Sequence, residues 1–119
     1  MAVTADEATA LAMGLGEVTA VPHFDRTAFR TPRRIFATLA ADGEDLNLML
    51  DPELQAFYCE QAPDAFAPVP GGWGKSGSTR VLLAAADPDT FKGALMAAHA
   101  RANLPPPAKA RKGKGKAAL

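Results

Sequence analysis

Four arginines in the first third of the chain are the clearest candidates for binding chemistry. Arg26, Arg30, Arg33 and Arg34 lie within nine positions. A guanidinium group is planar and can bind two phosphate oxygens at once, so such a cluster is typical of a surface that contacts nucleic-acid phosphates. A solvated strand surface, paired with carboxylates such as Asp25 or Asp45, has the same composition. The cluster therefore leaves two interpretations open, a phosphate-binding face and a structural one.

A glycine-rich segment carries the second candidate site. Residues 70–77 hold four glycines around Trp73 and Lys75. Glycine allows a close approach of backbone to ligand, an indole ring can stack on a base or sugar, and an ammonium group can meet an anion. The spacing does not match a Walker phosphate-binding loop, because position 69 is Val. The alternative is an ordinary connection between strands whose tryptophan packs on the sheet.

The C-terminal tail is the third candidate. The formal net charge of zero excludes a uniformly basic nucleic-acid binder, but the charge is unevenly distributed. Residues 1–108 carry −5 and residues 109–119 carry +5. Such a tail could contact nucleic acid in a salt-sensitive way or serve only solubility. Its basic residues are Lys109, Arg111, Lys112, Lys114 and Lys116.

Catalytic, metal and cofactor sites are not indicated. His23, His99 and Cys59 lie in three separate segments, without the spacing of metal ligands or of a nucleophile and its base. We therefore expect no catalytic residues, no metal and no cofactor. The single cysteine excludes an internal disulfide, and the longest apolar run is too short to span a bilayer. No Lys or Arg precedes Arg26, so the basic start of a signal peptide is missing. We expect a cytoplasmic protein without a membrane partner, and the monomer is the favoured state.

Cap and turn signals define the expected elements. Thr4 with Glu7, Asp51 with Pro52, and Asp87 with Pro88 mark the starts of three helices, the first over about residues 5–15. In the second helix Leu54, Phe57 and Tyr58 share an apolar face. Strands are expected at residues 18–21, 27–30, 34–39, 46–50, 66–69 and 79–85, with a hairpin turn at Asp42-Gly43. Strict alternation in the third strand places Arg34 and Phe36 on one face.

This order predicts an α+β fold, an antiparallel sheet flanked by helices. Residues 1–103 would form the folded domain. Residues 104–119, with three prolines followed by a mixture of Lys, Arg, Gly and Ala, would form a disordered basic tail.

The order and spacing of several short motifs resemble the YjbR family, also called MmcQ/YjbR. They are Pro22-His23-Phe24, Phe29-Arg30, Arg34-Ile35-Phe36-Ala37, the hairpin leading to Asp51-Pro52-Glu53, and Gly72-Trp73-Gly74-Lys75-Ser76-Gly77-Ser78-Thr79. The similarity covers about residues 3–103. It implies a frataxin-like (CyaY/YjbR) fold, and some members carry a DNA-binding label. Two features depart from the common pattern: Pro32-Arg33 replaces Gly-Gly, and Trp73-Gly74-Lys75 replaces a Lys-Lys-x-Trp segment.

The expected function is that of a small non-enzymatic DNA-binding protein. Arg26, Arg30, Arg33, Arg34, Lys75 and the basic tail would contact phosphates, and Trp73 would stack. The alternative is a module that binds a small ligand or a protein through the Trp73 segment, with no role in nucleic-acid binding. An acidic first helix suited to iron is not present, since that helix offers only Asp6 and Glu7.

Overall fold

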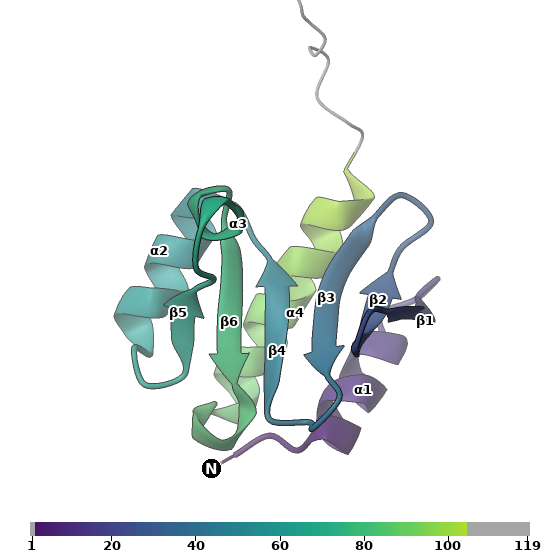
Figure 1. The fold of residues 1–119 in the computed structure, drawn as a ribbon, viewed down its shortest axis with the longest axis horizontal. Coiled ribbons are helices and arrows are strands. Elements are labelled where there is room, and N and C mark those ends of the chain that lie inside the picture. The colour runs from purple at the N-terminus through teal and green to yellow at the C-terminus, as the bar shows by residue number, and fades with distance from the viewer. Residues whose placement is uncertain (1, 105–119) are drawn as a thin grey trace, which may run out of the picture.

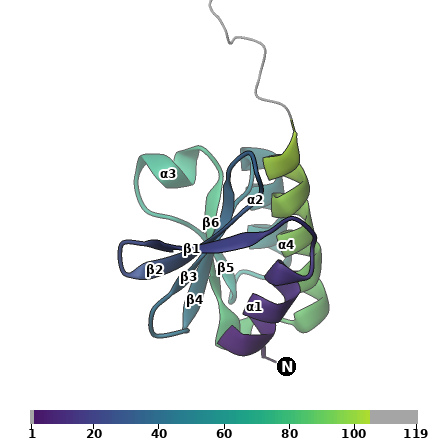
Figure 2. The same ribbon diagram turned by 90° about the vertical axis from the view of Figure 1, so that its right-hand side faces the viewer.

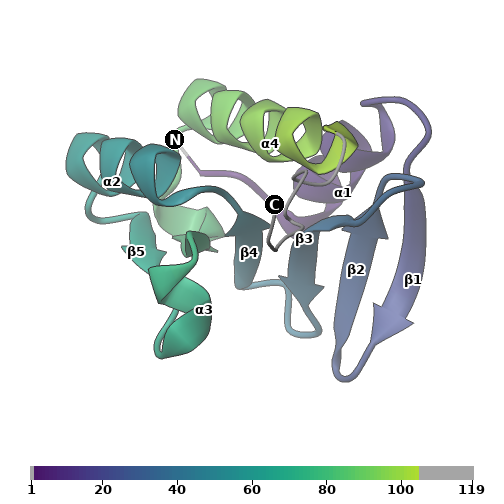
Figure 3. The same ribbon diagram turned by 90° about the horizontal axis from the view of Figure 1, so that it is seen from above.

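One six-stranded antiparallel sheet organises the protein, with helices α1, α2 and α4 on one face and the short helix α3 on the other (Figures 1 and 3). The computed structural model describes residues 2–104. The predicted α+β class is confirmed. The elements are α1 (Ala5–Met13), β1 (Thr19–His23), β2 (Arg26–Arg30), β3 (Ile35–Ala40), β4 (Asp45–Met49), α2 (Pro52–Gln61), β5 (Phe66–Pro68), α3 (Gly72–Lys75), β6 (Ser78–Leu82), a 3-10 turn (Leu83–Ala85) and α4 (Pro88–Asn103).

The strands follow the order β1-β2-β3-β4-β6-β5, and all neighbours are antiparallel. The predicted hairpin of β3 and β4 is present, with Gly43 at φ 74° in the turn, where glycine avoids the strain of a side chain. A second tight hairpin joins β1 to β2: His23 pairs with Arg26, so only two residues form the turn.

The three predicted helix starts are all capped as expected. The side chain of Thr4 accepts from the N–H of Glu7, whose carboxylate accepts in return from the N–H of Thr4. Asp51 accepts from the N–H of Leu54, and Asp87 accepts from that of Thr90. These local signals are short-range hydrogen bonds, which is why the sequence alone predicts them well.

The hydrophobic core lies between the sheet and the helices. Leu46 and Leu48 of β4 and Val81 of β6 point into it, and their neighbours in each strand point to the opposite face. Helix α4 contributes Phe91 and Leu95 together with Ala94, Ala98 and Ala102. Alanine side chains are small, so they allow this helix to lie close against β3 and β4, which it contacts. The alanine-rich composition thus builds a thin, well-filled core.

The structure corrects several local predictions. The strand pairing is irregular at Phe36: Phe29 faces Ala37 and Arg30 faces Ile35, so Phe36 has no partner. Phe36 and Ala37 are therefore both buried, and the alternation expected for residues 34–38 is wrong. Phe57 does not join the core of α2 but is 54% exposed.

Three element boundaries also differ from expectation. Helix α1 ends at Met13, before Leu15, and the last strand ends at Leu82, where a 3-10 turn begins. The segment expected as an irregular loop, residues 70–77, contains α3. Helix α4 ends at Asn103, and among residues 2–104 no helix has the length and apolar composition required to cross a bilayer.

Candidate groove and basic end of the sheet

A groove of about 400 Å³ crosses the sheet face that α1, α2 and α4 leave uncovered. Its two walls project from this face: the turn between β1 and β2 on one side and α3 on the other (Figures 2 and 3). Between them the floor is mainly apolar and includes Ile35 of β3 and Met49 of β4. A concave, largely apolar site of this size is typical of small-ligand binding.

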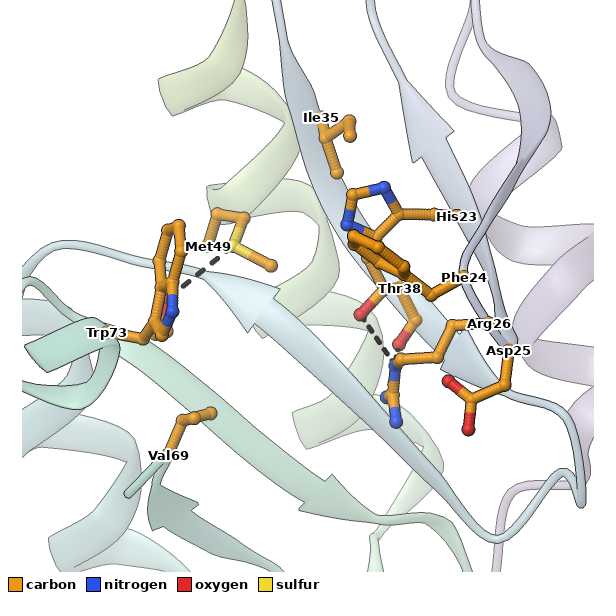
Figure 4. A pocket seen from close by; sticks show the side chains of 10 residues that line it. His23, Phe24, Asp25, Arg26, Ile35, Thr38, Met49, Val69 and Trp73 are labelled. Atoms are coloured by element: carbon orange, nitrogen blue, oxygen red, sulfur yellow. Dashed lines mark hydrogen bonds between the residues drawn. The ribbon is translucent and has the colours of Figure 1, made fainter. Parts of the chain in front are cut away.

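Each wall carries one exposed aromatic residue, and the two lie on opposite sides of the groove (Figure 4). Phe24 is 96% exposed and Trp73 is 73% exposed, more than any other large apolar side chain of residues 2–104. The ring of His23 contacts that of Phe24 edge to face, with 4.9 Å between centroids. Large apolar groups gathered on one exposed site indicate a binding surface.

The wall that carries Trp73 packs closely against the rest of the protein because of two glycines in this segment. A Cβ on Gly74 would lie 1.8 Å from the carbonyl oxygen of Val69, and one on Gly77 would lie 2.1 Å from that of Leu50. These two glycines therefore permit close packing within the protein, not an approach to a ligand. The side chain of Gln55, which no sequence motif indicates, donates from Nε2 to the carbonyl oxygens of Gly74 (2.8 Å) and Ser78 (2.9 Å).

Arg26, at the edge of the groove, is engaged within the protein. Its Nη2 lies 2.9 Å from Oδ1 of Asp45 and donates to the carbonyl oxygen of Thr38, while Nε donates to Thr38 Oγ1. Arg80 binds the other oxygen of Asp45 at 3.3 Å. Of the two interpretations of the arginine cluster, the structural one therefore applies to Arg26, because this residue pairs with Asp45.

The other selected basic residues gather at one end of the sheet. There β2 and β4 finish, β3 and β6 begin, and the last turn of α4 is joined to the β2–β3 loop by the hydrogen bond from Thr31 Oγ1 to the carbonyl oxygen of Ala102 (Figure 1). Within residues 2–104 the two ion pairs present both involve Asp45, at the other end. We call this region the basic end; its basic residues are Arg30, Arg33, Arg34, Lys75 and Arg101.

Carboxylates are present there but are concentrated at the opposite end. Near the basic end lie Glu17, Asp51 and Glu53, and Asp51 already caps α2. The opposite end holds the two hairpin turns and the starts of α1 and α4, where most acidic residues lie. They include Asp6, Glu7, Asp25, Asp42, Glu44, Asp45, Asp87 and Asp89. The body of the protein is therefore acidic overall yet polarised along its strands.

The basic end also includes the last residue that the structure describes, Leu104. The predicted contacts of the tail, Lys109, Arg111, Lys112, Lys114 and Lys116, lie outside the described residues. The tail sequence therefore continues from the basic end, not from the acidic one.

The residues considered for catalysis do not come together. His99 of α4 packs edge to face on Phe36 and lies 3.3 Å from the carbonyl oxygen of Gly16, whereas His23 is at the groove. Burial raises the pKa of the Cys59 thiol, which disfavours the reactive thiolate. Over residues 2–104 no group of three His, Cys, Asp or Glu side chains is placed to hold a metal ion.

Comparison with known families identifies the chain's relatives. A family model described as YjbR matches residues 13–101, most of the chain. The protein belongs to the YjbR family. This match confirms the resemblance inferred from the motifs. A separate comparison with curated proteins found no match to the chain.

A solved structure supports the fold of this YjbR protein. The crystal structure of Deinococcus radiodurans protein DR2400, described as a DUF419 domain, superposes with a TM-score of 0.69. It shares 19% sequence identity, and the match covers 81% of this chain and 75% of the other. At this identity the likeness shows a common fold.

Several groove residues, Phe24 and Met49 among them, carry no clear signal of a binding site in the sequence. Phe24 entered only as part of the family motif, because Phe-Asp lacks the Asn-Gly or Asp-Gly signature of a tight hairpin turn. Met49 lies within the strand expected at residues 46–50, and its residue type gives no indication of a binding role. A usable signal existed in β4: Asp45, Asn47 and Met49 alternate with buried leucines, which indicates a second, uncovered face.

Proposed function

We propose that this YjbR protein acts by binding and not by catalysis, and that its basic end binds DNA. The observation that supports this proposal is the position of Arg30, Arg33, Arg34 and Lys75 at one end of the sheet, away from the ion pairs of Asp45. We still expect these residues and the tail to contact DNA, as the sequence predicts. Arg26 is left out, since its Nε and Nη2 already donate to Thr38 and Asp45.

The charge and the geometry of this end support phosphate binding. Arg33 is exposed on the β2–β3 loop and Lys75 is exposed on α3, so two separate elements present cations to one partner. Each phosphate contact releases condensed counterions, so the affinity of such a surface falls steeply with salt. The tail, which continues from this end, would add to the same salt-dependent term.

The test is fluorescence anisotropy of labelled DNA across a salt series. The double substitution Arg33→Ala and Lys75→Ala should weaken binding about tenfold at low salt and reduce the slope of log K against log[salt] by about 2. Lys92→Ala is the matched control, because Lys92 is exposed on α4, nearer the acidic end. Equal effects of the two changes, or no binding at any salt concentration, would contradict the proposal.

A chain shortened after Leu104 separates the two basic regions. If residues 2–104 bind DNA through the basic end, the shortened chain should bind DNA more weakly overall. In that chain Lys75→Ala should still lower the affinity for DNA more than Lys92→Ala does. If the shortened chain does not bind DNA at all, the basic end is not the DNA-binding surface.

The second candidate function is the small-ligand or protein-binding module that the sequence left open. The groove between Phe24 and Trp73 is the observation that favours it. This function requires no nucleic acid, so the anisotropy experiment also decides between the two.

A further inference from the structure

Phe24 has a backbone conformation that its side chain does not favour. It is the first residue of the two-residue turn between β1 and β2, and its φ of 60° lies in the left-handed region. Glycine is the residue that such a turn position prefers, and a bulky aromatic side chain there is strained. Strain of this kind, retained next to a cavity, points to a functional role.

Packing within the protein does not account for Phe24 either. The side chain is 96% exposed, and the ring of His23 is the aromatic group that it contacts. A residue that is both strained and exposed adds little to the folded state through burial. Trp73, on the opposite wall, has the same combination of size and exposure (Figure 4).

The space between these two rings suits a flat ligand. The cavity of about 400 Å³ can hold one small ring system, and its floor presents Ile35, Met49 and Val69 to such a ring. Ser78 is buried but lines the groove, and among the described residues the partner of its hydroxyl is only the sulfur of Met49, at 3.5 Å. Two aromatic walls, an apolar floor and one available hydroxyl favour a heteroaromatic ring with polar edges.

A cation lies on the same face of the sheet as this space. Arg30 pairs across β2 and β3 with Ile35, a residue of the groove floor, and cross-strand partners share a face. Its Nε donates to the carbonyl oxygen of Thr31 at 3.2 Å, and its two terminal nitrogens have no hydrogen-bond partner among residues 2–104. This guanidinium is complementary to an anionic group attached to the ring.

We propose that the groove binds one unpaired nucleotide, with its base between Phe24 and Trp73 and its phosphate at Arg30. This inference rests on the proposed function in that the partner is DNA, and it adds that a single strand is preferred. A paired base is not accessible to the two rings, whereas an unpaired base can stack on an aromatic side chain irrespective of its identity.

Trp73, the only tryptophan of the chain, reports directly on this site. A short oligothymidylate should quench its fluorescence, and the matched duplex should quench it much less. Phe24→Gly should weaken the binding of oligothymidylate at least about fivefold, as expected for the loss of one stacking partner. The same substitution removes the backbone strain, so the Tm should equal or exceed that of the unmodified protein.

Phe57→Ala is the matched control, since Phe57 is an exposed phenylalanine of α2 that does not line the groove. It should leave the binding of oligothymidylate unchanged. Equal affinity of Phe24→Gly and Phe57→Ala for the single strand, or equal binding of duplex and single strand without quenching of Trp73, would overturn this inference. The proposed function would survive that result if Arg33→Ala with Lys75→Ala still weakened binding.

Thymidine monophosphate distinguishes the remaining cases. Quenching by the mononucleotide that Phe24→Gly abolishes, without binding of any oligonucleotide, would retain the nucleotide site and refute the proposed DNA function. Absence of binding by the mononucleotide, the single strand and the duplex at low salt would refute both.

Discussion

The two faces of the sheet differ in burial and polarity, although adjacent residues of the same strands form them. The face that α1, α2 and α4 cover is apolar and tightly filled, and it contains Leu48 with no exposed surface. The uncovered face is one residue away: Met49 points into the groove, and Asp45 holds Arg26 and Arg80. Burial of apolar surface drives folding, so the first face should carry most of the stability and the second most of the binding.

The largest expected difference between the faces is at neighbouring positions of β4. Leu48→Ala should lower the free energy of unfolding by about 3 kcal/mol, because a fully buried leucine is replaced by a cavity. Met49→Ala removes a half-buried side chain at the groove and should cost less than about 1 kcal/mol. Urea denaturation measures both, and equal losses would show that the uncovered face also supports the fold.

The next largest effect concerns the wall of the groove. Gly74→Ala should destabilise the protein by about 2 kcal/mol and displace α3, since its Cβ would collide with the Val69 carbonyl oxygen. Gly72→Ala is the matched control in the same helix, where a Cβ meets nothing within 4 Å. Denaturation together with the fluorescence maximum of Trp73 checks this pair. Similar behaviour of the two variants would mean that α3 adapts without strain.

A smaller effect is expected at the polar centre of the uncovered face. Asp45→Asn should reduce stability by about 1 kcal/mol, because it weakens the interactions with both Arg26 and Arg80, which are partly screened by solvent. The loss should shrink in high salt. Asp25→Asn, an exposed position outside these ion pairs, should change stability little. Urea denaturation at two salt concentrations measures this loss. A loss of stability that is the same at both concentrations would contradict an ionic role for Asp45.

The smallest effect lies on the covered side, at the start of α4. The backbone hydrogen bond from Thr90 holds the pKa of Asp87 below its ordinary value of 3.8. The charged cap therefore stabilises the protein above that value, and this contribution is lost as the pH falls through the lower folded-state pKa. Asp87→Asn keeps an acceptor without the titration. The stability difference between the two proteins should disappear in strong acid; a constant difference in denaturation series would refute the assignment.

Local sequence patterns correctly predicted the structural features that depend on short-range interactions. The caps at Thr4, Asp51 and Asp87 and the turn at Asp42-Gly43 each depend on residues within a few positions of one another, and all are confirmed. Predictions were wrong where distant segments decide the outcome. The irregular pairing at Phe36 depends on the register with β2, and the exposure of Phe57 depends on how α2 meets the sheet.

Patterns in the amino-acid sequence were sufficient to predict the helix starts, the hairpin of β3 and β4, the α+β class and the membership of the YjbR family. The sequence also supplied the arginines and the Trp73 segment. Three features depend on the assembled sheet: Asp45 binds Arg26, Arg30 pairs with Ile35 of the groove floor, and Phe24 lies across the groove from Trp73. The reason is physical: caps and turns are local hydrogen bonds, whereas a groove exists only once strands far apart in the chain lie in one sheet.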